Sequence, residues 1–205
     1  MFLSKLTLLP RSRQVLRDIA SPYDLHRTIM RGFPSRDAGG PGRVLHRLEP
    51  ARDGQPPVVL VQSDKAPDWS ALEALDGYLL DVAVKPYQPA LRPGQKLQFR
   101  LRANPTVRRE GKRHGLLRPE DQLQWFHRKA LQGGFQPLGV TLCRQERLVS
   151  RKKDHAGQMI QPVHLGVDFQ GTLQVTDAQL FAAALAGGVG AAKGYGFGLL
   201  SVAPA

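Results

Sequence analysis

The residues whose types are most suited to binding or chemistry lie near the end of this 205-residue chain. The segment from Gly187 to Gly198 contains six glycines in twelve residues, together with Lys193 and two aromatic residues. Glycine adopts backbone conformations that other residues avoid, and it lets the main chain come close to a ligand. Backbone N–H groups beside a lysine suit an anion, most simply a phosphate.

The position of this segment limits the kind of phosphate site that it can form. A Walker loop requires Ser or Thr after its lysine, whereas Gly194 follows Lys193. A dinucleotide-binding fingerprint opens a βαβ unit near a helix N-terminus, whereas here a predicted helix precedes the glycines and a strand follows them. Two interpretations stay open: a loop that grips the backbone of a polymer, and a mobile turn that lets the last strand enter its sheet.

Histidine is the second candidate for chemistry, because it titrates near neutral pH and can accept or donate a proton. The chain has six histidines. His26 falls on a predicted helix that begins with Ser21 as N-cap and Pro22 at N1 and runs to about residue 32. Tyr23 and Arg27 lie on a neighbouring face of that helix. Such a histidine is usually structural or solvated, so the residue pattern by itself does not assign catalysis.

The charge balance points to an acidic partner. Lysine and arginine number 29 against 17 acidic residues, which gives a net charge of +12 and a pI near 10.4. Residues 92–118 carry nine basic groups and one acidic group, whereas residues 53–91 carry two and six. Separated patches of this kind indicate a folded basic surface rather than a basic tail. Nucleic acid is the favoured partner, followed by a membrane surface or an acidic protein.

Composition also excludes several classes of protein. One cysteine, Cys143, allows neither an intramolecular disulfide nor a multi-cysteine zinc site, and its apolar surroundings predict a buried structural residue. The histidines and carboxylates show no metal-ligand spacing. The N-terminus does not resemble a signal peptide, and no apolar run is long enough for a membrane span. We therefore expect a soluble cytoplasmic protein that binds neither metal nor cofactor.

The order of predicted elements indicates an α+β fold. Two rounds of a βαββαβ plan fit the chain, which is the split unit of ferredoxin-like domains, and we place the boundary between Pro86 and Pro93. Leu25 and Ile29 should face the core from the first long helix, and Leu123, Phe126 and Leu131 from the helix that begins at Pro119. A basic loop is expected from Asn104 to Gly115. The predicted strands are 2–8, 43–49, 58–62, 78–84, 96–102, 140–149, 163–175 and 199–203, and the predicted helices are 12–20, 21–32, 69–75, 119–131 and 177–185.

Four stretches of the sequence resemble one known family. They are Phe2–Leu6, Pro22–Arg27, the Phe99–Pro105 segment that reads FRLRANP, and the glycine segment from Gly188 to Ser201. Together they are similar to the CRISPR repeat-processing endoribonucleases of the CasE type, over nearly the whole chain. The RLRANP segment and the terminal glycine segment are the most specific parts of this resemblance.

The resemblance implies tandem ferredoxin-like (RRM-type) domains over residues 1–88 and 89–205. It implies metal-independent cleavage of CRISPR repeat RNA at a hairpin, by attack of the RNA's own 2′-OH, to give 2′,3′-cyclic phosphate and 5′-OH ends. The enzyme would keep the mature guide RNA and join the other subunits of the Cascade complex. The alternative from a different class is a non-catalytic protein that binds structured RNA.

The family pattern also implies roles for individual residues. His26 would be a catalytic acid or base, Tyr23 would contact the scissile phosphate or the 2′-OH, and Arg31 would stabilise charge near a position where some members carry lysine. Arginine stays protonated, so a proton-donating role for Arg31 is disfavoured. The expected RNA-binding residues are Arg27, Arg102, Arg108, Arg109, Lys112, Arg113, Arg151, Lys152, Lys153, Gly188, Gly190, Lys193, Gly194 and Gly196. Lys193 is the charge that the glycine segment would present.

Overall fold

The computed structural model describes residues 1–50, 53–153 and 156–205. Contacts group these residues into two units. Unit 1 comprises residues 1–88, 149–162 and 194–196, and unit 2 comprises residues 89–148, 163–193 and 197–205. No helix in the described part of the chain is long and apolar enough to cross a membrane.

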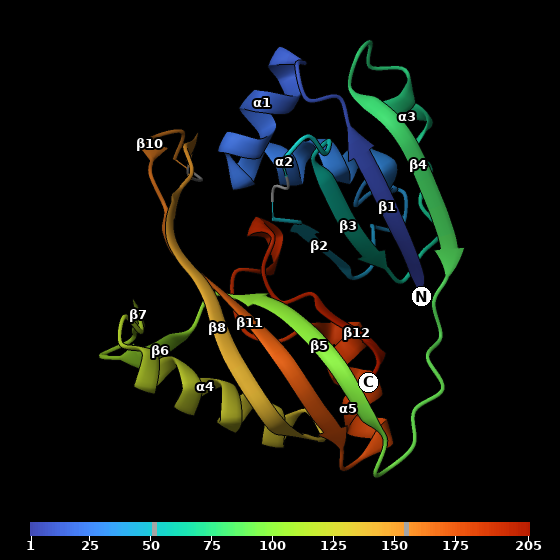
Figure 1. Ribbon diagram of the computed structural model, residues 1–205. Coiled ribbons are helices and arrows are strands. Elements are labelled where there is room, and N and C mark those ends of the chain that lie inside the picture. Colours follow the sequence, from blue (N-terminus) through green and yellow to red (C-terminus); the bar gives the residue numbers. More distant parts are fainter. Residues whose placement is uncertain (51–52, 154–155) are drawn as a thin grey trace. The chain divides into compact units, whose positions relative to one another are not determined.

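Unit 1 contains a four-stranded antiparallel sheet in the order β2-β3-β1-β4, with α1 and α2 following β1 in the chain (Figure 1). This order is that of a ferredoxin-like domain, in which the third strand pairs beside the first. The elements are β1 (Phe2–Leu8), α1 (Arg13–Ala20), α2 (Pro22–Ile29), the 3-10 turn η1 (Met30–Gly32), β2 (Val44–Leu48), β3 (Val58–Ser63), α3 (Ser70–Glu73) and β4 (Leu79–Pro86).

The register of this sheet decides which residues meet α2. Residues directly opposite one another in antiparallel strands point to the same face. Leu6 pairs with Val59, and both belong to the buried cluster that includes Leu25 and Ile29 of α2. The predicted apolar face of this helix is therefore confirmed, although regular α-helix ends at Ile29 and the chain continues to Gly32 as the 3-10 turn.

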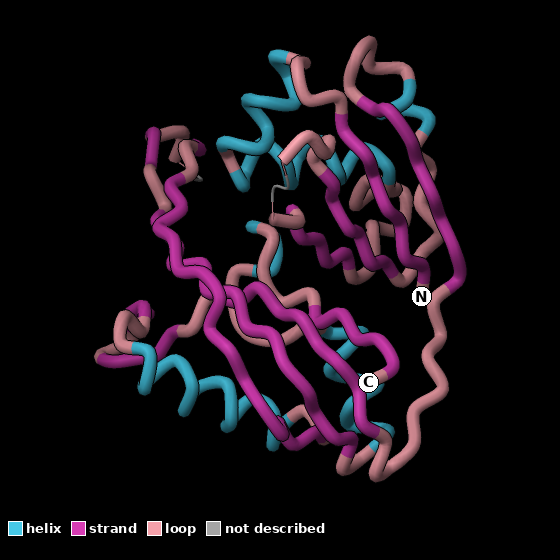
Figure 2. The backbone as a smooth tube through the Cα atoms, in the orientation of Figure 1, coloured by secondary structure: helices cyan, strands magenta, loops and turns pink. Residues whose placement is uncertain are grey.

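Unit 2 repeats the plan, with sheet order β12-β5-β11-β8 (Figure 2). The predicted pair of ferredoxin-like folds is thus confirmed. Phe126 of α4 stacks on Phe99 of β5 and Phe169 of β11, at ring-centroid distances of 5.2 and 5.0 Å. The elements are β5 (Lys96–Ala103), β6 (Thr106–Arg109), β7 (Lys112–Gly115), α4 (Pro119–Gln132), β8 (Phe135–Val149), β11 (Val163–Val175), α5 (Ala178–Gly187), η2 (Lys193–Tyr195) and β12 (Leu200–Pro204), while the short pair β9 (Lys152–Lys153) and β10 (Met159–Ile160) lies between β8 and β11 in sequence.

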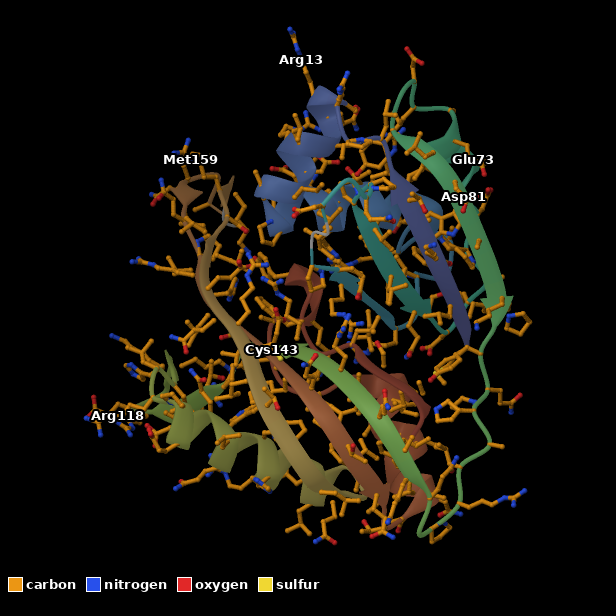
Figure 3. The ribbon with its side chains drawn as sticks, in the orientation of Figure 1. Arg13, Glu73, Asp81, Arg118, Cys143 and Met159 are labelled. Atoms are coloured by element: carbon orange, nitrogen blue, oxygen red, sulfur yellow. The ribbon has the colours of Figure 1, made fainter. Side chains whose placement is uncertain are left out.

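Two predictions about packing are wrong. Leu131 of α4 is 81% exposed, because Trp125, Phe126 and Ala130 form the buried side of that helix. Cys143 is exposed on β8 (Figure 3), since the strand alternates and its neighbour Leu142 faces the core instead.

The basic segment from Asn104 to Gly115 is also not a loop. It forms the hairpin β6–β7, in which Arg109 pairs with Lys112 across a two-residue turn. Both turn residues, Glu110 and Gly111, have positive φ values of 49° and 75°. Such turns match the right-handed twist of paired strands. The positive charges are therefore carried on a defined hairpin, which adjoins the N-terminal end of α4 (Figure 1).

Candidate functional site: two stacked histidines and a basic hairpin

Helix α2 is fixed at its start and along its length, and it carries the proposed catalytic side chains. The Ser21 hydroxyl accepts a hydrogen bond from the Asp24 amide at 3.4 Å, as an N-cap residue should. The buried carboxylate of Asp18 in α1 accepts hydrogen bonds from the Thr28 hydroxyl at 2.6 Å and the Tyr78 hydroxyl at 2.9 Å. These bonds tie α2 to α1 and to the residue before β4, so the helix has one defined position in unit 1.

His26 projects from this helix with its ring partly buried. Burial lowers the pKa of His26 from 6.5, because desolvation disfavours the charged imidazolium. Its Nδ1 is buried without a hydrogen-bond partner in the part of the chain that the structure describes. At neutral pH the ring is therefore an uncharged imidazole, which is the form that accepts a proton.

The ring of His46 on β2 stacks on the ring of His26, with centroids 5.8 Å apart and planes inclined by 19°. His46 is fully buried, and burial together with the nearby His26 lowers its pKa to about 3. This residue was not singled out from the sequence. The signal was nevertheless present, because strand alternation puts position 46 in an apolar row with Val44 and Leu48.

Two glycines of the terminal segment lie against these two rings. A Cβ added to Gly194 would lie 3.6 Å from Cε1 and Nε2 of His26, and one added to Gly196 would lie 3.5 Å from Nε2 of His46. Between them, the ring of Tyr195 has the ammonium group of Lys152 at 5.9 Å from its centroid. The segment predicted to bind phosphate is thus brought to the proposed catalytic histidine.

The remaining proposed catalytic residues lie on or just after α2. Tyr23 is one helical turn before His26 and is partly buried, and the guanidinium of Arg27 lies 5.9 Å above its ring. This cation–π contact orients both side chains. Arg31 is exposed in η1. Its charge is therefore available to solvent and to a ligand.

The hairpin β6–β7 gathers most of the predicted RNA-binding cations of unit 2. Its four cationic side chains are exposed, and they belong to Arg108, Arg109, Lys112 and Arg113. Arg108 and Arg113 form a cross-strand pair. Like charges that lie directly opposite one another repel, so an anion between them would be favourable.

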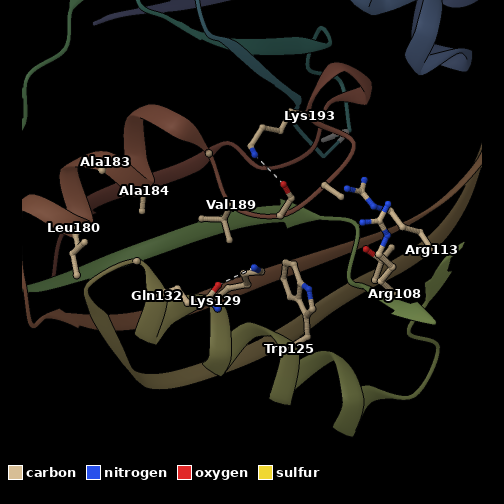
Figure 4. Close-up of a pocket in the computed structure, with 15 residues that line it drawn as sticks. Arg108, Arg113, Trp125, Lys129, Gln132, Leu180, Ala183, Ala184, Val189 and Lys193 are labelled. Carbon is tan, nitrogen blue, oxygen red and sulfur yellow. Dashed lines mark hydrogen bonds between the residues drawn. The ribbon is translucent and has the colours of Figure 1, made fainter. Parts of the chain in front are cut away.

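A cavity of about 520 Å³ in unit 2 lies beside this hairpin (Figure 4). Arg108 and Arg113 line one end, Trp125 lines the middle, and Lys129 and Lys193 add further positive charge. None of the residues that line it is acidic. Gly188, Val189 and Gly190 line part of its wall, so the glycine segment and the basic hairpin both border the cavity.

Two of the predicted RNA-binding cations have partners within unit 2. Arg102 is 7% exposed and ion-paired with Glu146, with Asp168 nearby, so its guanidinium is buried in the unit. Its backbone carbonyl accepts a hydrogen bond from the Gly198 amide at 2.8 Å. The Lys193 ammonium group donates to the Gly190 carbonyl at 3.0 Å, which secures the fold of the glycine segment from within.

The second basic cluster lies at β9. Arg151 is exposed, and Lys152 is the residue whose ammonium group lies over Tyr195. The side chain of Lys153, and the whole of Asp154 and His155, lie outside the described residues. Within residues 1–50, 53–153 and 156–205, no group of three or more His, Cys, Asp and Glu side chains is arranged to hold a metal ion.

Comparison with known proteins supports the resemblance drawn from the sequence. The family model described as CRISPR associated protein matches residues 1–204. The chain is 45% identical to CRISPR-associated endoribonuclease Cse3 of Thermus thermophilus and 29% identical to the CRISPR system Cascade subunit CasE of Escherichia coli, in each case over the full length of both proteins.

Solved structures agree with this result. A structure of CRISPR endoribonuclease Cse3 bound to a 19-nucleotide RNA matches with a TM-score of 0.88 and 44% identity, covering all of both chains. Cas6e of E. coli matches with a TM-score of 0.70 and 27% identity, also over all of both chains. The agreement covers both ferredoxin-like folds and the terminal segment, and the chain belongs to the CRISPR-associated protein family.

Proposed function

We propose that this protein is an endoribonuclease that cleaves CRISPR repeat RNA at a hairpin without a metal ion. The observation that carries the proposal is the position of His26, a partly buried neutral imidazole that lies against the terminal glycine segment. The similarity to Cse3 over both full lengths supports the choice of substrate. The proposed domains are residues 1–88, with the catalytic helix, and residues 89–205, with the basic hairpin.

The proposed reaction is a transesterification. His26 accepts the proton of the attacking 2′-OH as the 2′ oxygen bonds to phosphorus, and the bond from phosphorus to the 5′ oxygen breaks. The leaving 5′ oxygen takes up a proton from water, giving a 2′,3′-cyclic phosphate and a 5′-OH. The lowered pKa of His26 favours the role of base, because the ring is neutral before it reacts.

The charges around α2 fit the needs of the transition state. The phosphorane carries more negative charge than the starting phosphodiester, so fixed cations and hydrogen-bond donors lower the barrier. Arg27 and Arg31 supply the cations, and the Tyr23 hydroxyl supplies a donor. The backbone at Gly194 lets the RNA phosphate come near the His26 ring, because this residue has no side chain to exclude it.

The basic surfaces account for RNA binding in the same proposal. The phosphates of the RNA hairpin would be held by the exposed cations of β6–β7, by Arg151, and by the cavity that Gly188 and Gly190 line. An A-form major groove is too deep and narrow for base readout, so these groups would recognise shape and backbone. The protein would then retain the guide RNA in the cytoplasm. It would also assemble with other Cascade subunits, because CasE of E. coli is named as a subunit of that complex.

The test is cleavage of a transcribed repeat hairpin, taken from the CRISPR array of the same genome, in excess EDTA. The expected result is one cut with a cyclic phosphate on the upstream product, identified by mass spectrometry. Binding without any product over a full time course would overturn the proposal and establish a non-catalytic RNA-binding protein. Cleavage that EDTA abolishes would overturn the metal-free mechanism.

A further inference from the structure

We propose that His46 is a positioning residue, which holds the ring of His26 in the orientation that reaction requires. The inference rests on the proposed function, and it concerns a residue outside the motif that carries His26. An anomaly in the core of unit 1 motivates it. Position 46 is buried in the core, yet it holds a histidine whose ring nitrogens have no hydrogen-bond partner among the described residues.

The register of the sheet establishes that position. His46 lies directly opposite Val61 on β3, and Val61 lies opposite Ser4 on β1. These side chains therefore share one face of the sheet. The neighbours Val44 and Leu48 on the same strand pack against the cluster that contains Leu25 and Ile29 of α2. A valine or leucine would suit position 46 by every rule of core packing.

The histidine at this position is unfavourable for stability. It is fully buried, and neither Nδ1 nor Nε2 has a hydrogen-bond partner in the described part of the chain. A neutral imidazole always has one donor and one acceptor nitrogen, so burial leaves both unsatisfied. Buried polar groups without partners are rare in proteins and call for an explanation outside folding.

The contacts of the ring supply that explanation. One side of His46 stacks on His26, with the planes inclined by 19°. Its Nε2 faces the backbone of Gly196, while His26 faces Gly194 two residues earlier. The two rings therefore form a short column between α2 and the terminal segment. A flat, rigid ring beneath His26 restricts rotation of the His26 ring about its Cβ–Cγ bond.

His46 acts through geometry and not through charge. With a pKa of about 3, its ring is neutral at neutral and mildly acidic pH. Replacing His46 leaves the other charged and titratable groups of the surrounding elements in place. They are Tyr23, Asp24 and Arg27 on α2, Arg31 in η1, Arg47 on β2, which is ion-paired with Glu49, Lys152 on β9 and Tyr195 in the terminal segment.

Three full-length proteins test the inference: wild type, His46→Leu and His46→Phe. Leucine fills the core position without a ring, whereas phenylalanine keeps a flat ring and removes both nitrogens. Single-turnover cleavage of the repeat hairpin should fall about tenfold or more in His46→Leu, since small misplacements of a reacting group have effects of this size. His46→Phe should recover most of that loss. The RNA dissociation constant should change less than about twofold in both, because the hairpin cations that bind phosphate are untouched.

Two further readouts separate positioning from a structural role. The melting temperature of His46→Leu should equal or exceed that of wild type, because an unsatisfied polar group is replaced by an apolar one. The midpoint of the pH–rate profile should stay where it is. Slower cleavage with a lower melting temperature, a shifted midpoint, or no recovery in His46→Phe would each overturn the inference.

A measurement that needs no catalysis distinguishes failure of the inference from failure of the proposed function. Carbon-13 relaxation at Cε1 of His26 reports the mobility of its ring. The order parameter should be high in wild type and His46→Phe and lower in His46→Leu. An equally ordered ring in His46→Leu overturns the positioning role, whether or not the wild-type protein cleaves RNA. Wild-type protein that binds the hairpin but never cuts it overturns only the proposed function.

Discussion

Gly194 lies against the imidazole of His26, so that a Cβ at position 194 would lie 3.6 Å from Cε1 and Nε2 of that ring. His26 belongs to α2, near the start of the chain, and Gly194 belongs to the 3-10 turn η2, near its end. The contact places a backbone without side chains directly beside a neutral proton acceptor. The proposed catalytic ring therefore lies against the main chain of the terminal glycine segment.

Replacing His26 with alanine should abolish most of the cleavage and leave RNA binding nearly unchanged. General base catalysis contributes about 10²–10⁴-fold to a rate, and His26→Ala leaves every cation proposed to bind phosphate in place. Single-turnover cleavage and filter binding on the same RNA measure the two effects. His127→Ala is the matched control, since His127 is an exposed histidine on α4. Equal losses in cleavage and binding would show that His26 is a binding residue.

The rate of cleavage should depend on pH through His26. Burial lowers the pKa of His26 below 6.5, and the base must be neutral to act. Activity should therefore be constant near neutral pH and fall as the pH drops through that lowered pKa, with a midpoint below 6.5. Single-turnover rates across mildly acidic to neutral pH measure the profile. A rate that falls as the pH rises through the same range would assign His26 the role of acid.

The stability of the protein should also fall in mild acid because of His46. Its pKa is lowered in the folded state to about 3, whereas it is about 6.5 when unfolded, so below pH 6.5 the unfolded state binds the extra proton. Above pH 6.5 the ring is neutral in both states and protonation costs no stability, and the loss of stability grows progressively as the pH falls toward 3. The slope should reach at most about 1.4 kcal/mol per pH unit for one group. Urea unfolding at several pH values measures it, and His46→Leu should show a shallower dependence.

Removing cations from the hairpin β6–β7 should weaken RNA binding in a salt-dependent way. Arg109→Ala and Lys112→Ala each delete an exposed charge. Each phosphate contact that is lost should reduce the slope of log K against log salt by about one. Cleavage at saturating RNA should be unchanged. Arg13→Ala is the control, since Arg13 is an exposed cation on α1 (Figure 3). An unchanged slope in both hairpin variants would exclude the hairpin from the RNA-binding surface.

Alanine substitutions at Gly190 and Gly187 test the terminal segment, with Gly187→Ala as the control for Gly190→Ala. Gly190 has φ of 88°, and a Cβ there would come within 2.9 Å of Cζ2 of Trp125. Gly190→Ala should therefore cost about 1–2 kcal/mol of unfolding free energy from the backbone alone. Gly187 ends α5, and a Cβ there meets nothing within 4 Å, so Gly187→Ala should be neutral or slightly stabilising. Equal melting temperatures for the two variants would contradict this account of the loop.

Local chemistry along the chain predicts most of the elements. Alternation over Phe2–Leu8 and Lys96–Ala103 predicts strands, and Ser21 with Pro22 predicts the start of α2, because caps and strand periodicity depend on neighbours in sequence. The hairpin at Arg108 was missed since its turn lacks the usual Asn-Gly or Asp-Gly pair. Leu131 was misplaced because one position around a helix moves a side chain from the core to solvent.

The amino-acid sequence alone predicts the two ferredoxin-like folds, the helix that carries His26 and the glycine-rich backbone of the terminal segment. Which side chains meet follows from the tertiary structure. It buried Arg102 against Glu146, gave Lys193 a carbonyl partner, and put His46 under His26. Such contacts join residues through the fold rather than through local preference. They depend on strand register and on the path of a loop, which are set by the packing of the whole unit rather than by the preferences of neighbouring residues.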